Sequence, residues 1–206
     1  MSRLALDHDS TALLIMDCQN EIIHPEGKMV PWGFAAQVAE RAILPRIASL
    51  AEAARRAQVP VIYIIVAYEP GHREVRENAR MFRGARKSQT LVKGSWGAEV
   101  HAAIAPQPGD LVVNKLRVNA FYGSPLEVIL TGLGASTLIL CGVATNFVVE
   151  SSARHAADAG YRVLVAEDCC ASMNAAMHAF SVEHILPIFA EVVASETLIA
   201  ALEPAS

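Results

Sequence analysis

Short apolar runs alternate along the chain with longer segments in which apolar and polar residues are mixed. The runs contain many β-branched residues and no regular polar alternation. Strands that are apolar on both faces are typical of a parallel sheet covered by helices on each side. The pattern predicts strands at residues 11–16, 59–66, 111–113, 137–140 and 162–165.

Between these runs the sequence favours helices, at residues 34–58, 96–104, 125–132, 146–160 and 173–190. Gly132, Gly134 and Gly160 stand where helices would end and release the chain into the next strand. Alternating strands and helices imply right-handed crossovers. We therefore expect a three-layer α/β/α sandwich with a mainly parallel, doubly wound sheet. No repeat or linker divides the sequence, so residues 1–206 are interpreted as one domain.

Composition narrows the class of protein. With 53% hydrophobic and 18% charged residues, the chain can bury a substantial core and is not disordered. Its net charge of -4 is spread without a basic stripe, so no nucleic-acid partner is expected. The apolar runs are too short to span a membrane. The N-terminal residues lack a signal-peptide pattern, and four cysteines at positions 18, 141, 169 and 170 form no disulfide framework, so a cytoplasmic location is expected.

Residues that could bind or transform a ligand follow three of the predicted strands. Ligands of such folds bind at the carboxyl ends of the strands, and Asp17 and Lys115 each follow an apolar run. A third run leads through residues 142–146 into a helix, where free backbone N–H groups could hold an oxyanion. Taken singly, the aspartate could be a helix cap and the lysine a solvated surface residue. All three segments, however, belong at one edge of one sheet.

Three segments carry a more specific resemblance. Residues 14–20, 113–121 and 141–146 read LIMDCQN, VNKLRVNAF and CGVATN. They resemble the signature blocks of the isochorismatase-like hydrolases, also called the cysteine hydrolase superfamily. The similarity extends from about Thr11 to Leu198. It implies a hydrolase of small molecules that needs no cofactor and that assembles as a homodimer or homotetramer.

In that family an Asp, a Lys and a nucleophilic Cys form the catalytic site, and Asp17 and Lys115 match the first two. The nucleophile position, two residues beyond the Asn of the third block, is occupied here by Val148. Valine has no lone pair with which to form a covalent intermediate. The resemblance also places an anion-binding backbone near Val143 and Ala144.

The other candidate nucleophiles and ligands are weaker. Cys141 is interpreted as a buried structural cysteine, and a strained disulfide between Cys169 and Cys170 stays open. His178 and His184 are six residues apart, which does not place them on one helix face. We expect no required metal ion.

Isochorismatases proper lack the cysteine and cleave a vinyl ether by protonation. Their Lys-x-Arg-x-Ser-Ala-Phe block is similar to residues 115–121, so Arg117 could bind a substrate carboxylate, while Asn119 and Phe121 are candidate substrate-binding residues. Phe121 could equally pack beneath the pocket. The third block, however, resembles the amidases instead.

Three hypotheses remain from the sequence. The leading one is a hydrolase that acts without a cysteine nucleophile, through acid/base chemistry of Asp17 supported by Lys115. The second is a non-catalytic ligand-binding or assembly protein. The third is an ordinary cysteine amidase in which Val148 is a substituted nucleophile or another thiol has taken over. The substrate and the bond cleaved, ether or C–N, stay open.

Overall fold

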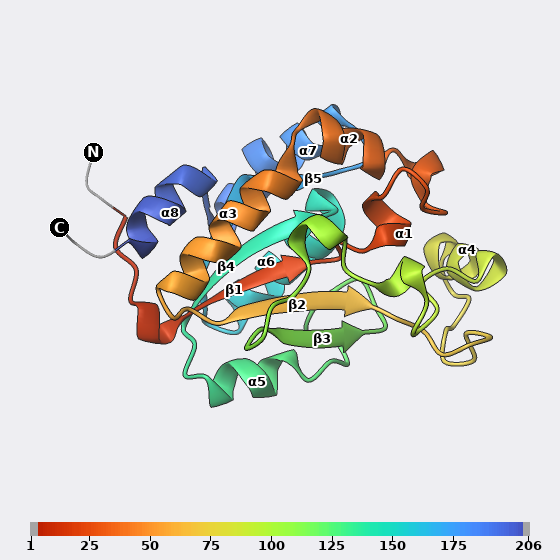
Figure 1. Ribbon diagram of the computed structural model, residues 1–206, viewed down its shortest axis with the longest axis horizontal. Coiled ribbons are helices and arrows are strands. Elements are labelled where there is room, and N and C mark those ends of the chain that lie inside the picture. The colour runs from red at the N-terminus through yellow and green to blue at the C-terminus, as the bar shows by residue number, and fades with distance from the viewer. Residues whose placement is uncertain (1–3, 204–206) are drawn as a thin grey trace.

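The computed structural model describes residues 4–203 and contains one six-stranded, all-parallel sheet with the order β3-β2-β1-β4-β5-β6. Figure 1 shows the strands pointing the same way, toward the end of the molecule that carries α1 and α4. The strands are β1 (Thr11–Met16), β2 (Val61–Val66), β3 (Leu111–Lys115), β4 (Thr137–Val143), β5 (Arg162–Ala171) and β6 (Glu191–Val193). This architecture confirms the predicted α/β class.

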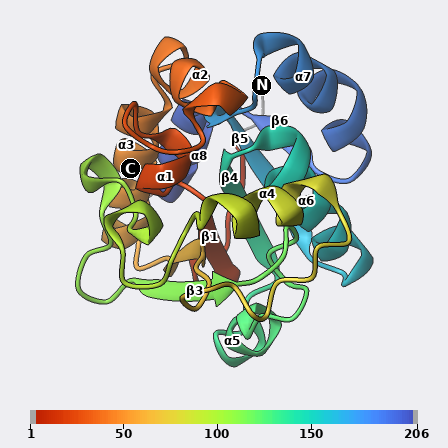
Figure 2. The same cartoon turned by 90° about the vertical axis from the view of Figure 1, so that its right-hand side faces the viewer.

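Helices cover both faces of the sheet. Figure 2 shows α2, α3 and α8 on one side and α6 and α7 on the other. The α-helices within the described residues are α1 (Asn20–Ile23), α2 (Phe34–Glu40), α3 (Ile43–Arg56), α4 (Arg80–Ser88), α5 (Leu126–Gly132), α6 (Glu150–Asp158), α7 (Ala175–Phe180) and α8 (Ser195–Leu202). None of the helices in residues 4–203 has the length and apolar character needed to cross a membrane.

The two central strands explain the sequence pattern and position the site. Every residue of β1 and of β4 is buried, because both faces of these strands are covered by helices. Strand order reverses between β1 and β4, since β2 and β3 lie on one side of β1 and β5 and β6 on the other side of β4. In open α/β sheets such a reversal leaves a crevice at the carboxyl ends of the strands, where ligands bind.

Two of the predicted helices are interrupted. The segment 34–58 forms two helices, with Ala42 in the left-handed region at φ 49° between them. Pro45 explains the break. Its backbone nitrogen carries no hydrogen to donate to a helical hydrogen bond, so a helix tolerates it only in the first turn, which is where α3 places it. The segment 173–190 forms α7 and then a π-helical turn and a short 3-10 helix, which contains Pro187.

The predicted helix at residues 96–104 is wrong. The segment contains two 3-10 turns joined by an extended stretch that pairs with the chain after β1. Asn20 N–H donates to the Glu99 carbonyl, and His101 N–H donates to the Cys18 carbonyl. These long-range hydrogen bonds outweigh the local helical propensity. Strand β6 and helices α1, α4 and α8 were not predicted.

Candidate active site

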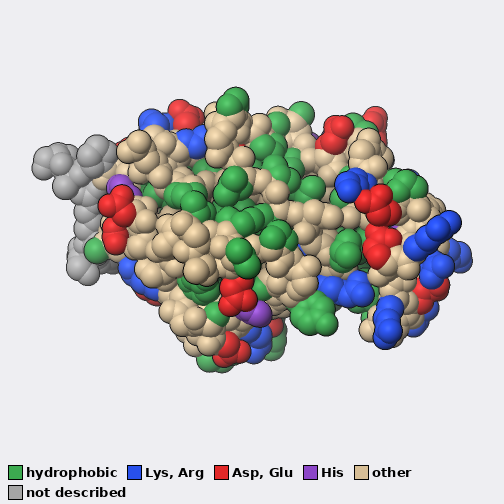
Figure 3. Space-filling view, turned by 90° about the horizontal axis from the view of Figure 1, so that it is seen from below, with side chains coloured by type: hydrophobic (Ala, Val, Ile, Leu, Met, Phe, Trp, Pro, Cys, Tyr) green, Lys and Arg blue, Asp and Glu red, His purple; other side chains and the backbone are tan. Residues whose placement is uncertain are grey.

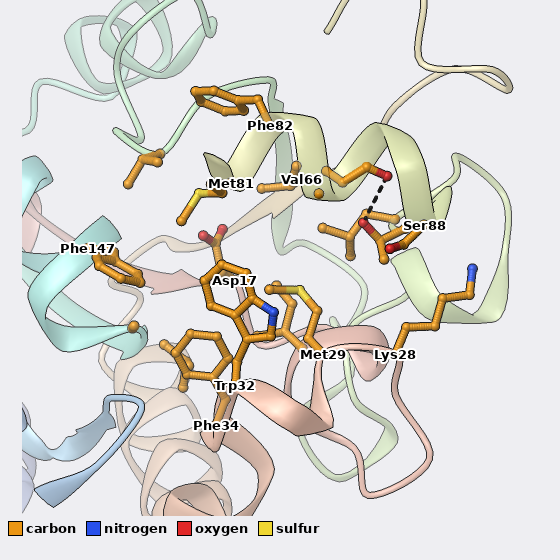
Figure 4. A pocket seen from close by; sticks show the side chains of 18 of the residues that line it. Asp17, Lys28, Met29, Trp32, Phe34, Val66, Met81, Phe82, Ser88 and Phe147 are labelled. Atoms are coloured by element: carbon orange, nitrogen blue, oxygen red, sulfur yellow. Dashed lines mark hydrogen bonds between the residues drawn. The ribbon is translucent and has the colours of Figure 1, made fainter. Parts of the chain in front are cut away.

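Asp17 stands directly after the central strand β1 in an unusual backbone conformation. Its φ is 56°, in the left-handed region that Asp tolerates better than most residues. The Asp17 N–H is held by the Ile64 carbonyl of β2 at 2.9 Å. This turn directs the side chain into a pocket, and Figure 4 shows the carboxylate facing Met81, with Phe147 and Trp32 nearby.

Lys115 comes from the end of β3, two strands away, and forms an ion pair with Asp17. The Lys115 Nζ lies 2.9 Å from Asp17 Oδ2 and also donates to the Arg117 carbonyl at 2.9 Å. The lysine side chain has no exposed surface and that of Asp17 is 12% exposed. Buried ion pairs contribute little net stability, because desolvation offsets the attraction. The pair therefore adds little net free energy to the stability of the fold.

The second oxygen of the Asp17 carboxylate is unusual. Oδ1 is buried and has no hydrogen-bond partner within residues 4–203. Burial raises the pKa of Asp17 above its ordinary value, and the attraction of Lys115 counteracts that shift only in part. A carboxyl group with a raised pKa and one unpartnered oxygen in a pocket can accept or deliver a proton there.

A close approach of β4 to β1 positions the third part of the site. A Cβ on Gly142 would lie 2.1 Å from the Met16 carbonyl oxygen, and the φ of Gly142 is 121°, so only glycine fits. The next two residues, Val143 and Ala144, line the pocket and are joined by a cis peptide bond. The sequence therefore brings the glycine turn to the same pocket as Asp17 and Lys115.

The turn after Ala144 is held in place by side chains from the C-terminal part of the chain. Thr145 Oγ1 lies 2.8 Å from Nδ1 of His178, a residue of α7. Ser172 Oγ donates to Asn146 Oδ1. Burial, together with the nearby Arg41, lowers the pKa of His178 and so favours its neutral ring, whose Nδ1 can accept a hydrogen bond from the Thr145 hydroxyl. Sequence reasoning did not find this support.

Val148 lies in the π-helical turn Thr145–Val149 that precedes α6. Its side chain is buried and is not among the residues that line the pocket, whereas the neighbouring Phe147 does line it. The apolar side chain that this turn contributes to the pocket is therefore that of Phe147, not that of Val148. No thiol or other nucleophile stands at either position.

The three candidate residues after Lys115 have different placements. Arg117 lines the pocket, with its guanidinium carbon 5.0 Å from the centre of the Phe82 ring. Asn119 does not line it, because its amide donates to the Ser151 carbonyl and its Oδ1 accepts two backbone N–H groups. Phe121 is buried and stacks on His155 at 4.4 Å, so it packs beneath the site rather than in it.

The remaining walls of the pocket are mostly apolar and were not identified from the sequence. Trp32 and Phe34 stack 6.1 Å apart on one side, and α4 contributes Met81 and Phe82 from the other (Figure 4). The cavity volume is about 150 Å³. Such a volume suits a small molecule, since an engineered cavity of about 150 Å³ holds benzene.

All four cysteines are buried and free. Burial raises the pKa of Cys169 to about 12, and it raises the pKa values of Cys18, Cys141 and Cys170 as well. Thiols of this kind are poor nucleophiles, because the thiolate is the reactive form. Cys169 and Cys170 are not joined by a disulfide.

Two histidines lie close together near α1. The rings of His24 and His101 are 5.5 Å apart, and each Nδ1 accepts a backbone N–H two residues further on. A neutral ring that accepts at Nδ1 carries its proton on Nε2, which leaves no lone pair for a metal ion. Across residues 4–203, no three His, Cys, Asp or Glu side chains are grouped as a metal ion would require.

Comparison with known proteins gives one consistent result. A model of the isochorismatase domain matches residues 11–197. The chain is 35% identical over 163 residues to the ureidoacrylate amidohydrolase RutB of Methylobacterium radiotolerans, a match that covers 73% of the chain but 63% of that relative. It is 30% identical to the isochorismatase family protein YecD of Escherichia coli O157:H7, over 97% of the chain and 100% of the relative. The structure of a cysteine hydrolase from Pseudomonas syringae pv. phaseolicola 1448A has a TM-score of 0.86 and 27% identity, covering 97% of this chain and 95% of that one.

Proposed function

The chain belongs to the isochorismatase family of hydrolases, and from this membership we propose that it hydrolyses a small molecule at the Asp17–Lys115 site without a cysteine nucleophile. The observation that carries the proposal is Oδ1 of Asp17, a buried oxygen without a hydrogen-bond partner in the described part of the chain. An unpartnered polar atom of this kind is costly to bury. A proton-donating ligand, water or substrate, would satisfy it.

The chemistry that we propose uses water as the nucleophile. The water oxygen attacks the carbonyl carbon of the substrate, and Asp17 takes a proton from that water. The π electrons of the carbonyl group move onto the carbonyl oxygen, which becomes the oxyanion. When the tetrahedral intermediate collapses, the C–N bond breaks and Asp17 returns the proton to the leaving nitrogen. A raised pKa suits both steps, because a general acid/base works best when its pKa lies near the operating pH. The name of one relative, an amidohydrolase, supports a C–N bond as the target.

The other site residues have supporting roles in this proposal. Lys115 keeps Asp17 oriented through Oδ2 and stabilises its ionised form. The backbone at Val143 and Ala144, which line the pocket, would stabilise the oxyanion. Arg117 lines the pocket and would bind a substrate carboxylate. Asn119 and Phe121 are engaged elsewhere in the fold, so we assign them no contact with substrate.

The decisive experiment removes the proton carrier and keeps its shape. Asp17→Asn should lower kcat/KM by about a thousandfold or more, because an amide cannot cycle a proton. Turnover would be measured on a panel containing ureidoacrylate, simple amides and vinyl ethers, with the products identified. Asp110→Asn is the matched control, since Asp110 is also a buried, ion-paired aspartate but pairs with Arg55 away from the pocket. It should lower stability and spare activity.

The same experiment separates the alternatives. An Asp17→Asn variant that keeps full activity would exclude the acid/base role. A wild-type protein that binds pocket ligands but turns over no compound of any class would favour the non-catalytic alternative.

A thiol test addresses the covalent mechanism directly. Alkylation with iodoacetamide, followed by mass spectrometry, should leave activity unchanged, because the four cysteines are buried. Labelling of one thiol together with loss of activity would restore the cysteine mechanism. Val148→Cys should create a reactive thiol if Val148 occupies the nucleophile position, and an inert thiol there would show that the assumed alignment of the turn is wrong.

A further inference from the structure

A polar group in the wall of the pocket, the hydroxyl of Tyr68, has no role in the mechanism proposed above. Tyr68 lies two residues beyond the end of β2, the strand between β1, which ends just before Asp17, and β3, which ends at Lys115. Its side chain lines the pocket, and the residue is only 4% exposed. The order of the strands therefore places the tyrosine between the two strands that carry the ion pair.

The backbone and the ring of Tyr68 are both held in place. Its N–H donates to the Leu91 carbonyl at 2.9 Å, and its carbonyl accepts the Lys93 N–H at 2.8 Å. The ring packs against that of His72, with the ring centres 4.9 Å apart. His72 is fully buried, and its Nε2 donates to the Thr90 carbonyl at 2.7 Å. A ligand in the pocket would therefore meet a hydroxyl that is already oriented, which lowers the entropic cost of binding.

The hydroxyl of Tyr68 differs from that of Tyr63, a buried tyrosine within β2 itself. The Tyr63 hydroxyl accepts a hydrogen bond from Arg55 at 3.1 Å. The Tyr68 hydroxyl forms no hydrogen bond to any group of residues 4–203, and it is not one of the side-chain polar atoms that the protein encloses completely, so it opens on the cavity. A tyrosine hydroxyl in a buried residue normally has a partner, because leaving it without one is costly. A ligand in the pocket would supply that partner.

Polar groups on the outside of this region do have partners. Figure 3 shows Lys and Arg side chains interspersed with Asp and Glu at the end of the molecule that carries α4. Lys93 pairs with Glu69 at 2.8 Å, and Arg86 pairs with Glu77 at 3.0 Å. The missing partner of the Tyr68 hydroxyl is therefore a property of the pocket wall and not of the whole segment that follows β2.

The Tyr68 hydroxyl is a hydrogen-bond donor at neutral pH. Burial raises the pKa of Tyr68 to about 12, and the negative charge of Asp17 acts in the same direction, whereas the positive charge of Arg117 opposes the shift. Both of these charged residues line the same pocket. A phenol that keeps its proton can donate it in a hydrogen bond to an acceptor atom of a ligand.

We propose that Tyr68 is a further ligand-binding residue of this pocket, and that its hydroxyl donates a hydrogen bond to a carbonyl oxygen of the ligand. The inference rests on the pocket of the proposed function and adds a residue that determines its specificity. Oδ1 of Asp17 is an acceptor without a donor, and the Tyr68 hydroxyl is a donor without an acceptor, so the two complement each other. A ligand that lacks the carbonyl oxygen would leave the hydroxyl unpaired, and a site built for a hydrogen bond rejects such an analogue.

Two probes of nearly the same shape test the hydrogen bond. Benzamide and thiobenzamide differ in one atom, and the thiocarbonyl sulfur is a much weaker hydrogen-bond acceptor than the carbonyl oxygen. Their dissociation constants would be measured by calorimetry for the wild type and for Tyr68→Phe, with the recovered probes checked for hydrolysis. The wild type should bind benzamide about tenfold more tightly than thiobenzamide. Tyr68→Phe should remove most of that preference, because it should weaken the binding of benzamide about five- to tenfold and change that of thiobenzamide little.

Tyr63→Phe is the matched control, since it removes the hydroxyl of another buried tyrosine, one that does not line the pocket. It should lower Tm by about 2–6 °C, because the hydrogen bond with Arg55 is lost, and leave both affinities unchanged. Tyr68→Phe should keep the Tm of the wild type or raise it, because its hydroxyl forms no hydrogen bond within the fold. A tyrosine with a purely structural role would not combine unchanged stability with weaker binding of benzamide.

A wild type that binds the two probes equally, or binds neither, would overturn the proposal. So would a Tyr68→Phe variant that keeps the preference for benzamide, or one that loses as much thermal stability as Tyr63→Phe. Because binding is measured without turnover, these outcomes are distinct from failure of the proposed hydrolysis. A protein that shows the expected preference but hydrolyses no compound would contradict the proposed hydrolysis alone.

Discussion

The pocket has two walls of opposite construction. The sheet edge contributes Asp17 and Lys115, which are buried, paired with each other and held by neighbouring strands. Helix α4 contributes Met81 and Phe82, yet has no buried residue of its own. Elements with few buried contacts open at the lowest free-energy cost. On the proposed mechanism the chemistry would depend on the buried wall, called here the rigid wall, whereas α4, called here the variable wall, would only contact the ligand.

The largest effect is expected when the buried ion pair between Asp17 and Lys115 is disrupted. Lys115→Ala should abolish turnover and lower the free energy of unfolding by about 3–5 kcal/mol, because the Asp17 carboxylate would stay buried without its partner. Chemical denaturation and steady-state kinetics measure the two effects. The double variant Asp17→Asn, Lys115→Met serves as control and should recover most of the stability but no activity. A Lys115→Ala protein as stable as the wild type would contradict the buried ion pair.

A second prediction concerns the support behind the rigid wall. His178→Ala removes the acceptor of the Thr145 hydroxyl and should lower the free energy of unfolding by about 1–3 kcal/mol. The turn that carries Ala144 would lose its position, so kcat should fall about tenfold with KM little changed. His184→Ala is the matched control, because His184 is exposed. Equal effects of the two substitutions would show that His178 does not position the turn.

The raised pKa of Asp17 predicts how activity and stability depend on pH. If Asp17 must be ionised to accept a proton, kcat/KM should rise with pH through a pKa above the ordinary value of 3.8. Stability should change in the opposite direction. The folded state binds more protons than the unfolded state above pH 3.8, so this group's contribution to stability falls as pH rises through its folded pKa. Asp17→Asn should remove that component of the stability curve, which a pH series of denaturation measurements would detect. A rate that falls with rising pH would assign Asp17 as an acid in the first step.

The smallest effect is expected in the variable wall. Phe82→Ala should raise KM about three- to tenfold, through loss of ring contact and of the stacking with Arg117, while stability changes by less than about 1 kcal/mol. Phe121→Ala makes the same substitution beneath the site and should cost about 3–5 kcal/mol of stability. Kinetics and thermal unfolding of both variants compare the walls directly. A large loss of stability in Phe82→Ala would show that α4 belongs to the rigid part.

The sequence correctly predicted the buried strands at the centre of the sheet, because burial on both faces leaves a recognisable run of apolar residues. The run at residues 11–16 coincides with β1, because strands buried on both faces are recognisable as unbroken apolar segments. Because ligands of parallel sheets bind at the carboxyl ends of the strands, the sequence also predicted that Asp17, Lys115 and the glycine turn lie close together. The structure brings them to one pocket.

The sequence was less informative where local pattern and tertiary context disagree. Helix α4 was missed because it is short, basic and without a buried residue, so it gives no apolar periodicity. The helix expected at 96–104 is replaced by pairing with residues 18–20, an interaction far away in sequence. Phe121 could be placed in or beneath the pocket only once the position of α6 was known, since it stacks on His155 of that helix.

The burial of all four cysteines has a practical consequence for studying the variable wall. A protein whose native thiols are shielded from reagents behaves like a cysteine-free background. A single cysteine introduced at an exposed position of α4, such as Arg83, could therefore carry a spin label or fluorophore without further engineering. Spectroscopy of that label would test whether the helix moves relative to the pocket.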